Sequence, residues 1–360
     1  MRVLLSGYYG FGNLGDEALL EVIVTRVRAR FAGADIEVLS NDPAGTALLG
    51  VEATPRWEWR AIREAIGRAD VVVSGGGGLL QNATSMRSLL YYAAILREAI
   101  RAKKKTMVFA QSIGPLDLWG RFAVRRFCSG LDRATVRDER SRALLSVLLA
   151  GTPVERTADP VFLYDAPAGD VDLSTEGLES GGPPYAIVSV RKVSNFREGV
   201  RTIARAVDRL AERHGVRVAF LPLGGASDAE VSTDVIRACE SAPVLLPECP
   251  LAKAAAIVRR ARFVIGMRLH ALILAARYTV PFLAIPYDPK VAALCDDLQY
   301  PLEPLWVPGR PRLSETAADG LVDRLVAQHD EIAAHLAERM AAVRVAAERN
   351  FDVLGELLGE

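Results

Sequence analysis

The chain has 360 residues, of which 50% are hydrophobic and 24% charged, and its formal net charge is zero. This length exceeds what one hydrophobic core usually serves, which favours two domains. The neutral total argues against a nucleic-acid partner, because nucleic-acid-binding domains carry a strong basic excess. No apolar run approaches the ~18 residues of a membrane span, and the N-terminus lacks the pattern of a signal peptide.

The four cysteines have neither the spacing of a disulfide framework nor that of a zinc site. We therefore expect free, mostly buried thiols, no metal ion, and a cytoplasmic protein in a reducing compartment. A peripheral contact with the inner face of the plasma membrane is compatible with this expectation if the substrate is carried on a lipid.

Strand-like apolar runs alternate with helical patterns along the whole chain, which predicts α/β architecture with parallel sheets. The expected strands are 3–5, 36–39, 71–73, 106–110, 134–137, 186–190, 217–221, 243–246, 263–265 and 281–285. The expected helices are 16–31, 60–68, 88–102, 120–130, 139–149, 200–214, 229–239, 251–259 and 269–277, followed by a helical region over 315–358.

One stretch interrupts this alternation. Residues 165–185 are rich in Gly, Pro, Ser and acidic residues, which is typical of a linker. The sequence therefore predicts a first Rossmann-like domain over 1–164, the linker, a second Rossmann-like domain over 186–310, and a helical segment over 311–360. Ligands of such doubly wound folds sit beyond the carboxyl ends of the strands.

The loop after the first strand contains Gly10-Phe11-Gly12-Asn13-Leu14-Gly15, a literal G-x-G-x-x-G. A dinucleotide fingerprint needs its first glycine close to the strand end, and here four residues intervene. Asp16 and Glu17 would also repel a pyrophosphate. Two interpretations remain open: a tight structural turn, or a loop whose backbone N–H groups and Asn13 bind another anion.

Two further loops follow strands. Ser74-Gly75-Gly76-Gly77-Gly78 leads to Gln81 and Asn82, and suits either close packing or a hydroxyl-rich ligand such as a sugar. Arg191 and Lys192 directly follow the strand at 186–190. Two cations at the carboxyl end of a strand favour an anion, although a solvated strand end is the simpler alternative.

The fourth loop, Gly266-Met267-Arg268-Leu269-His270, opens an apolar helix. A histidine at this position suits general acid or base work, since its pKa lies near neutrality, although a packed, hydrogen-bonded histidine is the simpler alternative. Lys290 lies in a loop downstream and is a candidate third cation.

Several of these stretches, in this order, resemble polysaccharide pyruvyl transferases of the CsaB type. They are SGYYGFGNLGDEALL, SGGGGLLQNATSMRSLLYY, AQSIGP, VRDERS, ADPVF, VSVR and GMRLHALILAARYTVPFLAIPYDPKV, between residues 3 and 291. The combination is specific, whereas each piece alone is weak. Many members of the family have Gly-Ser where this chain has Gly77-Gly78.

The resemblance implies a glycosyltransferase-B-like fold and transfer of a pyruvyl group from phosphoenolpyruvate to a sugar as a cyclic ketal. The acceptor in such bacteria is commonly N-acetylmannosamine of a lipid-linked secondary cell-wall polymer precursor, whose pyruvylation anchors S-layer proteins. No cofactor besides the phosphoenolpyruvate co-substrate is implied.

The family's arginine and histidine fall on Arg268 and His270, which we expect to be catalytic. Its other arginine falls on Arg191, so Arg191, Arg268, Leu269 and Lys290 are expected to bind the donor. The N-terminal loops, through Gly10, Gly12, Asn13, Gly76, Gly77 and Gln81, are expected to hold the acceptor or an anion. Asp16, Glu17 and Asp159 are unranked candidates for a carboxylate that assists His270.

Two rival functions stay open on this frame. One is a glycosyltransferase that uses a nucleotide sugar, and the other is a sugar- or nucleotide-binding protein without activity.

Overall fold

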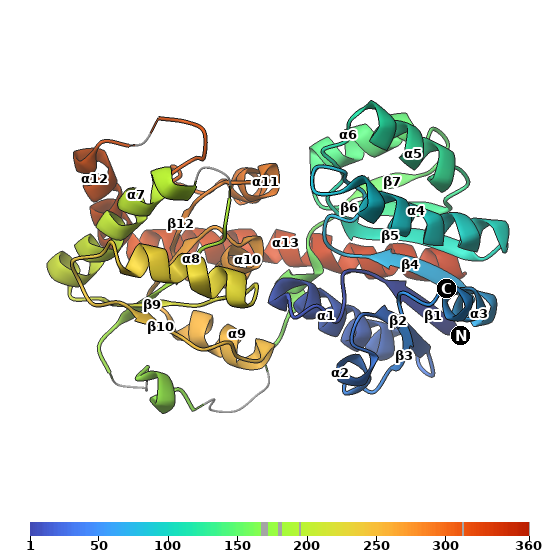
Figure 1. Ribbon diagram of the computed structural model, residues 1–360, viewed down its shortest axis with the longest axis horizontal. Helices are drawn as coiled ribbons and strands as arrows, with labels where there is room; N and C mark the ends of the chain where they lie inside the picture. The colour runs from blue at the N-terminus through green and yellow to red at the C-terminus, as the bar shows by residue number, and fades with distance from the viewer. Residues whose placement is uncertain (167–171, 179–181, 194–195, 312, 360) are drawn as a thin grey trace. The chain divides into compact units, whose positions relative to one another are not determined.

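The computed structural model describes residues 1–166, 172–178, 182–193, 196–311 and 313–359. The chain divides into two compact units: unit 1 comprises 1–164 and 343–360, and unit 2 comprises 165–342. Each unit contains one parallel sheet with helices on both faces, as Figure 1 shows, which confirms the predicted α/β class. The expected linker at 165–185 lies within unit 2 and partly outside the described residues.

Unit 1 holds a seven-stranded sheet in the order β3-β2-β1-β4-β5-β6-β7. Its strands are β1 (Arg2–Ser6), β2 (Asp35–Ser40), β3 (Glu52–Pro55), β4 (Val71–Gly75), β5 (Lys105–Gln111), β6 (Arg133–Val136) and β7 (Val154–Arg156). Its helices are α1 (Leu14–Arg30), α2 (Pro43–Ala47), α3 (Trp59–Arg68), α4 (Met86–Arg101), α5 (Leu118–Cys128) and α6 (Glu139–Leu148), with a 3₁₀ turn at Pro160–Leu163.

Unit 2 holds a five-stranded sheet in the order β10-β9-β8-β11-β12. Its strands are β8 (Tyr185–Ser189), β9 (Arg217–Phe220), β10 (Val244–Leu245), β11 (Phe263–Gly266) and β12 (Phe282–Ala284). Its helices are α7 (Phe196–Asp208), α8 (Ala226–Ile236), α9 (Leu251–Arg260), α10 (Leu269–Arg277), α11 (Pro289–Asp297) and α12 (Glu315–Ala327), with a π turn at Arg209–Arg213 and a 3₁₀ turn at Ser174–Glu176.

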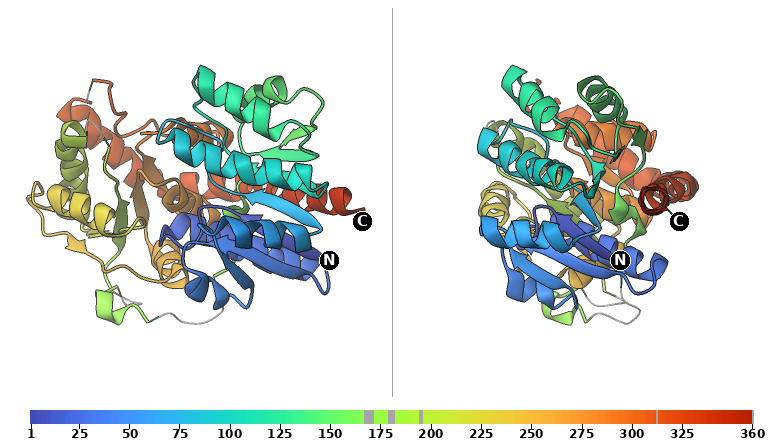
Figure 2. Two further views of the ribbon diagram at one scale, coloured as in Figure 1. Left: turned by 45° about the vertical axis from the view of Figure 1, so that its right-hand side comes forward. Right: turned by 90° about the vertical axis from the view of Figure 1, so that its right-hand side faces the viewer.

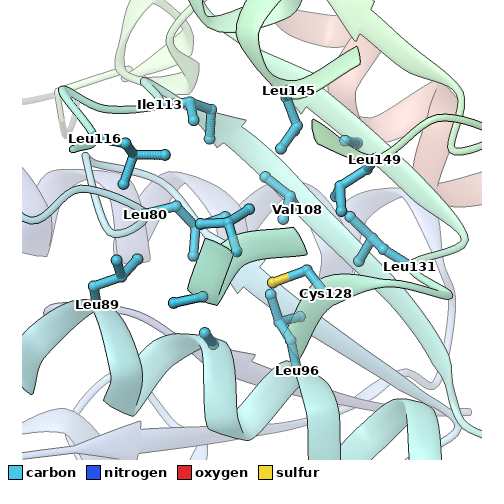
Figure 3. Close-up of a cluster of buried hydrophobic side chains, with 14 of the residues drawn as sticks. Leu80, Leu89, Leu96, Val108, Ile113, Leu116, Cys128, Leu131, Leu145 and Leu149 are labelled. Atoms are coloured by element: carbon cyan, nitrogen blue, oxygen red, sulfur yellow. The ribbon is translucent and has the colours of Figure 1, made fainter. Parts of the chain in front are cut away.

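The central strands are mostly apolar because helices cover both faces of each sheet. All residues of β4, β8 and β11 are buried. Figure 3 shows one side of the unit 1 core, where Leu96, Val108 and Cys128 meet between α4, α5 and the sheet. The four cysteines form no disulfide.

The last helix, α13 (His329–Leu358), begins in unit 2 and ends in unit 1. Its final turns pack on the unit 1 core, where the Phe351 ring meets Phe109 edge-on at 5.1 Å and Thr157 donates to Asn350 Oδ1 at 2.7 Å. Both ends of the chain therefore belong to unit 1, as Figure 2 shows. Within the described residues, no helix is both long and apolar enough to cross a membrane.

Two points about the predicted elements were wrong in detail. The strands β3 and β7 were not predicted, because they are short, partly exposed and polar. The segment around Lys290, expected as a loop, begins α11, with Asp288 as its N-cap. The expected helical region over 315–358 is confirmed, and it consists of two helices that separate at Gln328.

Candidate functional site

In unit 1 the loops after β1 and β4 lie side by side at the carboxyl edge of the sheet. The two strands are neighbours, and the chain leaves them toward opposite ends of the sheet, which makes this the topological switch point. Tyr9 Oη donates to the Gly75 carbonyl at 2.7 Å. A Cβ built on Gly77 would lie 3.1 Å from Asp16 Oδ1. The sheet thus brings together the two glycine loops that the sequence singled out.

The first glycine loop turns its donors toward a carboxylate of the chain itself. Gly10 N–H donates to Glu17 Oε1 at 2.9 Å, and the Phe11 and Gly12 N–H groups also bond this carboxylate. Burial raises the pKa of Glu17, and these three bonds oppose the rise. The Asn13 side chain accepts from Gly15 N–H at 3.3 Å as the N-cap of α1. An anion at this loop would have to compete with Glu17, so anion binding here stays a prediction.

The second glycine run is held by close packing. Gly76 and Gly77 have φ of +70° and +71°, and a Cβ on Gly76 would lie 2.8 Å from Leu19 Cδ1. The Gly77 carbonyl accepts from Arg137 Nη2 at 2.8 Å. Arg137 is in turn ion-paired with Asp159, and both side chains are buried. Asp159, a candidate assistant to the histidine, therefore holds Arg137 beneath this loop.

Gln81 and Gly78 also belong to the loop after β4. Gln81, expected at the acceptor, bonds Thr84 within its own turn, where Nε2 donates to Oγ1 at 2.7 Å. Gly78 does not have a positive φ, and the nearest atom to a Cβ built there is Ser112 O at 3.7 Å. The backbone therefore leaves room for the serine that many family members carry at this position.

In unit 2 the residues expected at the donor converge on one edge of the sheet. Strands β8 and β11 pair with Ser189 opposite Gly266, and Met267 N–H donates to Ser189 O at 2.8 Å. Arg191 and Arg268 each follow these paired residues by two positions. The chain leaves β8 and β11 toward opposite ends of the sheet, so this edge is the switch point of unit 2.

Arg268 is the N-cap of α10 and is held by a carboxylate that sequence reasoning missed. Its Nε donates to Asp228 Oδ2 at 2.7 Å and its Nη2 to Oδ1 at 2.5 Å. The Asp228 side chain is 1% exposed and that of Arg268 is 15% exposed. This fork fixes the guanidinium plane and neutralises most of its charge. The available signal was an acid in the first turn of a helix that follows a strand and two glycines.

Gly224 makes room for this arrangement. A Cβ built on Gly224 would lie 1.8 Å from Arg268 Nη2 and 2.5 Å from its Cζ. Because the guanidinium lies directly against the backbone, only glycine leaves Arg268 where it is.

Arg191, the other arginine at this edge, contacts a tyrosine. Its Nη1 donates to Tyr287 Oη at 2.9 Å, and its Cζ lies 4.8 Å from the centre of the Tyr287 ring. Its Nε is buried without a hydrogen-bond partner, and no ion pair joins it to any carboxylate among the residues that the structure describes. An uncompensated guanidinium of this kind favours a bound anion.

The other expected donor residues lie at the starts of the two helices that follow. His270 is half-buried in the first turn of α10, and Leu269 is buried beside it. Lys290 is in the first turn of α11, with its Nζ 3.9 Å from Asp288 Oδ2. No group of three or more His, Cys, Asp or Glu side chains capable of holding a metal ion occurs in the described part of the chain.

Comparison with solved structures agrees with this architecture. S. aureus MnaA in a co-structure with UDP has a TM-score of 0.69 at 10% identity, covering 99% of this chain and 97% of that one. A putative UDP-N-acetylglucosamine 2-epimerase from Listeria monocytogenes has 0.67 at 10% identity, covering 98% and 95%. Anabaena HepE in complex with UDP-glucose has 0.66 at 9% identity, covering 99% and 100%. The fold is therefore glycosyltransferase-B-like.

Sequence comparison gives the family. No curated protein matches the chain. The sequence model of the family described as polysaccharide pyruvyl transferase matches residues 13–289, a span that begins inside the first glycine loop, at Asn13, and includes the second glycine run of unit 1 and Arg191, Arg268 and His270 of unit 2. This match extends over most of the chain, which therefore belongs to the polysaccharide pyruvyl transferase family.

Proposed function

We propose that this transferase moves the pyruvyl group of phosphoenolpyruvate onto two hydroxyl groups of a saccharide, giving a cyclic ketal and inorganic phosphate. The observation that carries the proposal is Arg191, whose guanidinium pairs with no carboxylate in the described part of the chain, at the same sheet edge as Arg268 and His270. A small donor with a carboxylate and a phosphate needs cations placed in this way.

The two arginines have different roles in this proposal. Arg191 binds the donor anion, because its charge is not already neutralised. The Nε and Nη2 groups of Arg268 donate to Asp228, which fixes the orientation of the guanidinium. Its Nη1 group then remains to bind the donor. Lys290 adds a point charge that Asp288 neutralises only weakly at 3.9 Å.

The reaction needs protons moved in a defined order. One proton goes to C3 of the donor, which makes C2 electrophilic, and a sugar hydroxyl then attacks C2 and loses its own proton. The C2–O bond to phosphate breaks with its electron pair on the leaving phosphate, and a second hydroxyl closes the ring. The two hydroxyl protons balance the one at C3 and the one that leaves with phosphate.

We assign these transfers to His270. It is the histidine at this edge of unit 2, in the first turn of α10 directly after Arg268 and Leu269. General acid–base catalysis of this kind contributes about 10²–10⁴-fold to a rate. The resemblance to the CsaB type supports a lipid-linked acceptor that contains N-acetylmannosamine, in the synthesis of a secondary cell-wall polymer that anchors S-layer proteins.

The test is phosphate release from phosphoenolpyruvate by the full chain with a panel of N-acetylhexosamine acceptors, with product masses measured. His270→Ala should fold and lose about 10²–10⁴-fold in turnover. Arg191→Lys should weaken donor binding about thirtyfold, which corresponds to about 2 kcal/mol. Arg268→Lys should also reduce phosphate release, because an ammonium group cannot form the two-pronged contact with Asp228. Arg237→Lys is the matched control, since Arg237 lies at the C-cap of α8, is 75% exposed and is 3.6 Å from Asp234.

The rival that the fold supports is a nucleotide-sugar glycosyltransferase, because solved structures of similar fold carry UDP or UDP-glucose. Calorimetry with phosphoenolpyruvate and with a UDP-sugar separates the two functions. Binding of the UDP-sugar without binding of phosphoenolpyruvate would overturn the proposal. A binding protein without activity would take up ligand and release no phosphate.

A further inference from the structure

Helix α5 of unit 1 exposes three large apolar side chains. Leu118 is 83% exposed, Trp119 73% and Phe122 62%. The opposite face of the helix is anchored, because Ala123 and Cys128 are buried in the core cluster that Figure 3 shows. We call the outward face the α5 surface. It consists of these three residues and of Arg121, Arg125 and Arg126. Scattered apolar residues on a surface need no explanation, but three on one helical turn indicate a contact.

The α5 surface is also strongly cationic. Arg121, Arg125 and Arg126 are exposed on the same helix, and none of them forms an ion pair with a carboxylate among the described residues. Helix α4 packs alongside, and its Arg97 donates from Nη1 to the Arg126 carbonyl at 2.8 Å. The acid next to this face, Asp117, is turned back to accept from Gly120 N–H at 2.7 Å as the N-cap of α5.

Cations crowd together here. Arg101 ends α4 beside Arg97 and is exposed. Loss of hydration first, and repulsion from the Arg101 and Arg126 guanidiniums second, lower the pKa of Arg97. The chain as a whole has no net charge, so this basic concentration is local rather than a consequence of composition.

Two kinds of partner would cover an apolar face, and the charges distinguish them. A symmetric contact with a second copy of the chain would place arginines opposite arginines, which is unfavourable. A bilayer with anionic headgroups offers the opposite charge to the arginines and an apolar layer to Trp119, Phe122 and Leu118. Apolar and basic residues on one short helix are the usual composition of an interfacial anchor.

We propose that the α5 surface is a membrane-docking site that inserts Leu118, Trp119 and Phe122 into the interface of an anionic bilayer while its arginines bind the headgroups. This inference rests on unit 1 alone and does not require the proposed pyruvyl transfer. It assigns the chain a peripheral position at a membrane surface, where an acceptor carried on a lipid would be within reach.

The test is sedimentation of the full chain with vesicles of phosphatidylglycerol and phosphatidylcholine in equal parts, against vesicles of phosphatidylcholine alone. Neither donor nor acceptor is added, so failure of the proposed function does not affect the result. Each basic residue near an anionic surface contributes about fivefold to binding. The triple variant Arg121→Gln, Arg125→Gln, Arg126→Gln should therefore bind anionic vesicles about 100-fold more weakly.

A second variant removes the apolar contact instead. Trp119→Ser with Phe122→Ser should weaken binding at least about tenfold, and both exposed positions allow normal folding. The matched control is Leu48→Ser with Val345→Ser, which are 88% and 73% exposed in unit 1 outside the α5 surface. This control variant should bind anionic vesicles as tightly as the natural chain does. Added salt should weaken the vesicle binding of the control variant and of the natural chain alike.

Three results would overturn the proposal. The first is equal binding of the natural chain to neutral and anionic vesicles, or no binding to either. The second is undiminished binding by both α5 variants. The third is a dimer of the natural chain, measured by sedimentation equilibrium without vesicles, that the Trp119 and Phe122 substitutions dissociate, since it would identify the α5 surface as an interface between copies.

Discussion

Asp228 offers the sharpest test of the unit 2 site. The Asp228→Asn substitution keeps the size of the side chain but removes the charge that receives both Arg268 bonds. With the acid 1% exposed and the arginine 15% exposed, solvent screens the pair weakly. Breaking a buried pair by removing one partner leaves the other charge uncompensated and costs about 3–5 kcal/mol. We expect Asp228→Asn to lower the free energy of unfolding of unit 2 by about 3 kcal/mol.

The measurement must report on unit 2 alone. The chain has four tryptophans, and unit 2 contains one of them, Trp306, which is 2% exposed. With the other three replaced by Phe, urea unfolding followed by tryptophan fluorescence reports the unfolding of unit 2 in both variant and parent.

A double-mutant cycle isolates the pair. Arg268→Gln alone should also destabilise unit 2, and the two substitutions together should cost less than their sum by at least about 2 kcal/mol. A coupling below about 0.5 kcal/mol would mean that Arg268 and Asp228 do not form this fork, and the reasoning about a fixed guanidinium would be refuted. Phosphate release by Asp228→Asn should fall with the loss of that orientation.

Three further predictions come from particular contacts. Gly224→Ala should displace Arg268, whose Nη2 would lie 1.8 Å from the new Cβ, and reduce phosphate release about 10²-fold; unchanged kinetics would contradict the close approach. Gly78→Ser should change the free energy of unfolding of unit 1 by less than about 0.5 kcal/mol, whereas Gly76→Ala, with φ of +70°, should lower it by about 1 kcal/mol or more, as urea titration will show. A hydrogen bond from Arg209 is the main cause that lowers the pKa of Asp323 from 3.8 to about 2. The stabilisation from ionised Asp323 is therefore fully present above pH 3.8 and is lost as pH falls through about 2. Asp323→Asn should accordingly flatten the dependence of Tm on pH between these values, and a profile identical to that of the natural chain would count against the ion pair.

Much of the fold could be predicted from the sequence, because apolar periodicity reflects burial directly. Runs such as 71–73 and 263–265 have to lie in sheets covered on both faces, and their alternation with amphipathic helices leaves parallel α/β units as the consistent arrangement. The same pattern placed Arg191 and Arg268 after strands, and therefore at the carboxyl edge of a sheet. The edge strands β3 and β7 were not predicted, because short polar strands at the edge of a sheet contain few apolar residues.

Only the tertiary structure decided which groups neutralise one another. The order of strands brings Asp228, forty residues away in the chain, onto Arg268, and it leaves Arg191 with a tyrosine hydroxyl in place of a carboxylate. It also turns the donors of the first glycine loop toward Glu17. Sequence pattern records how deeply a residue is buried, but the partner of a buried charge depends on long-range contacts between elements, and those contacts are set by packing.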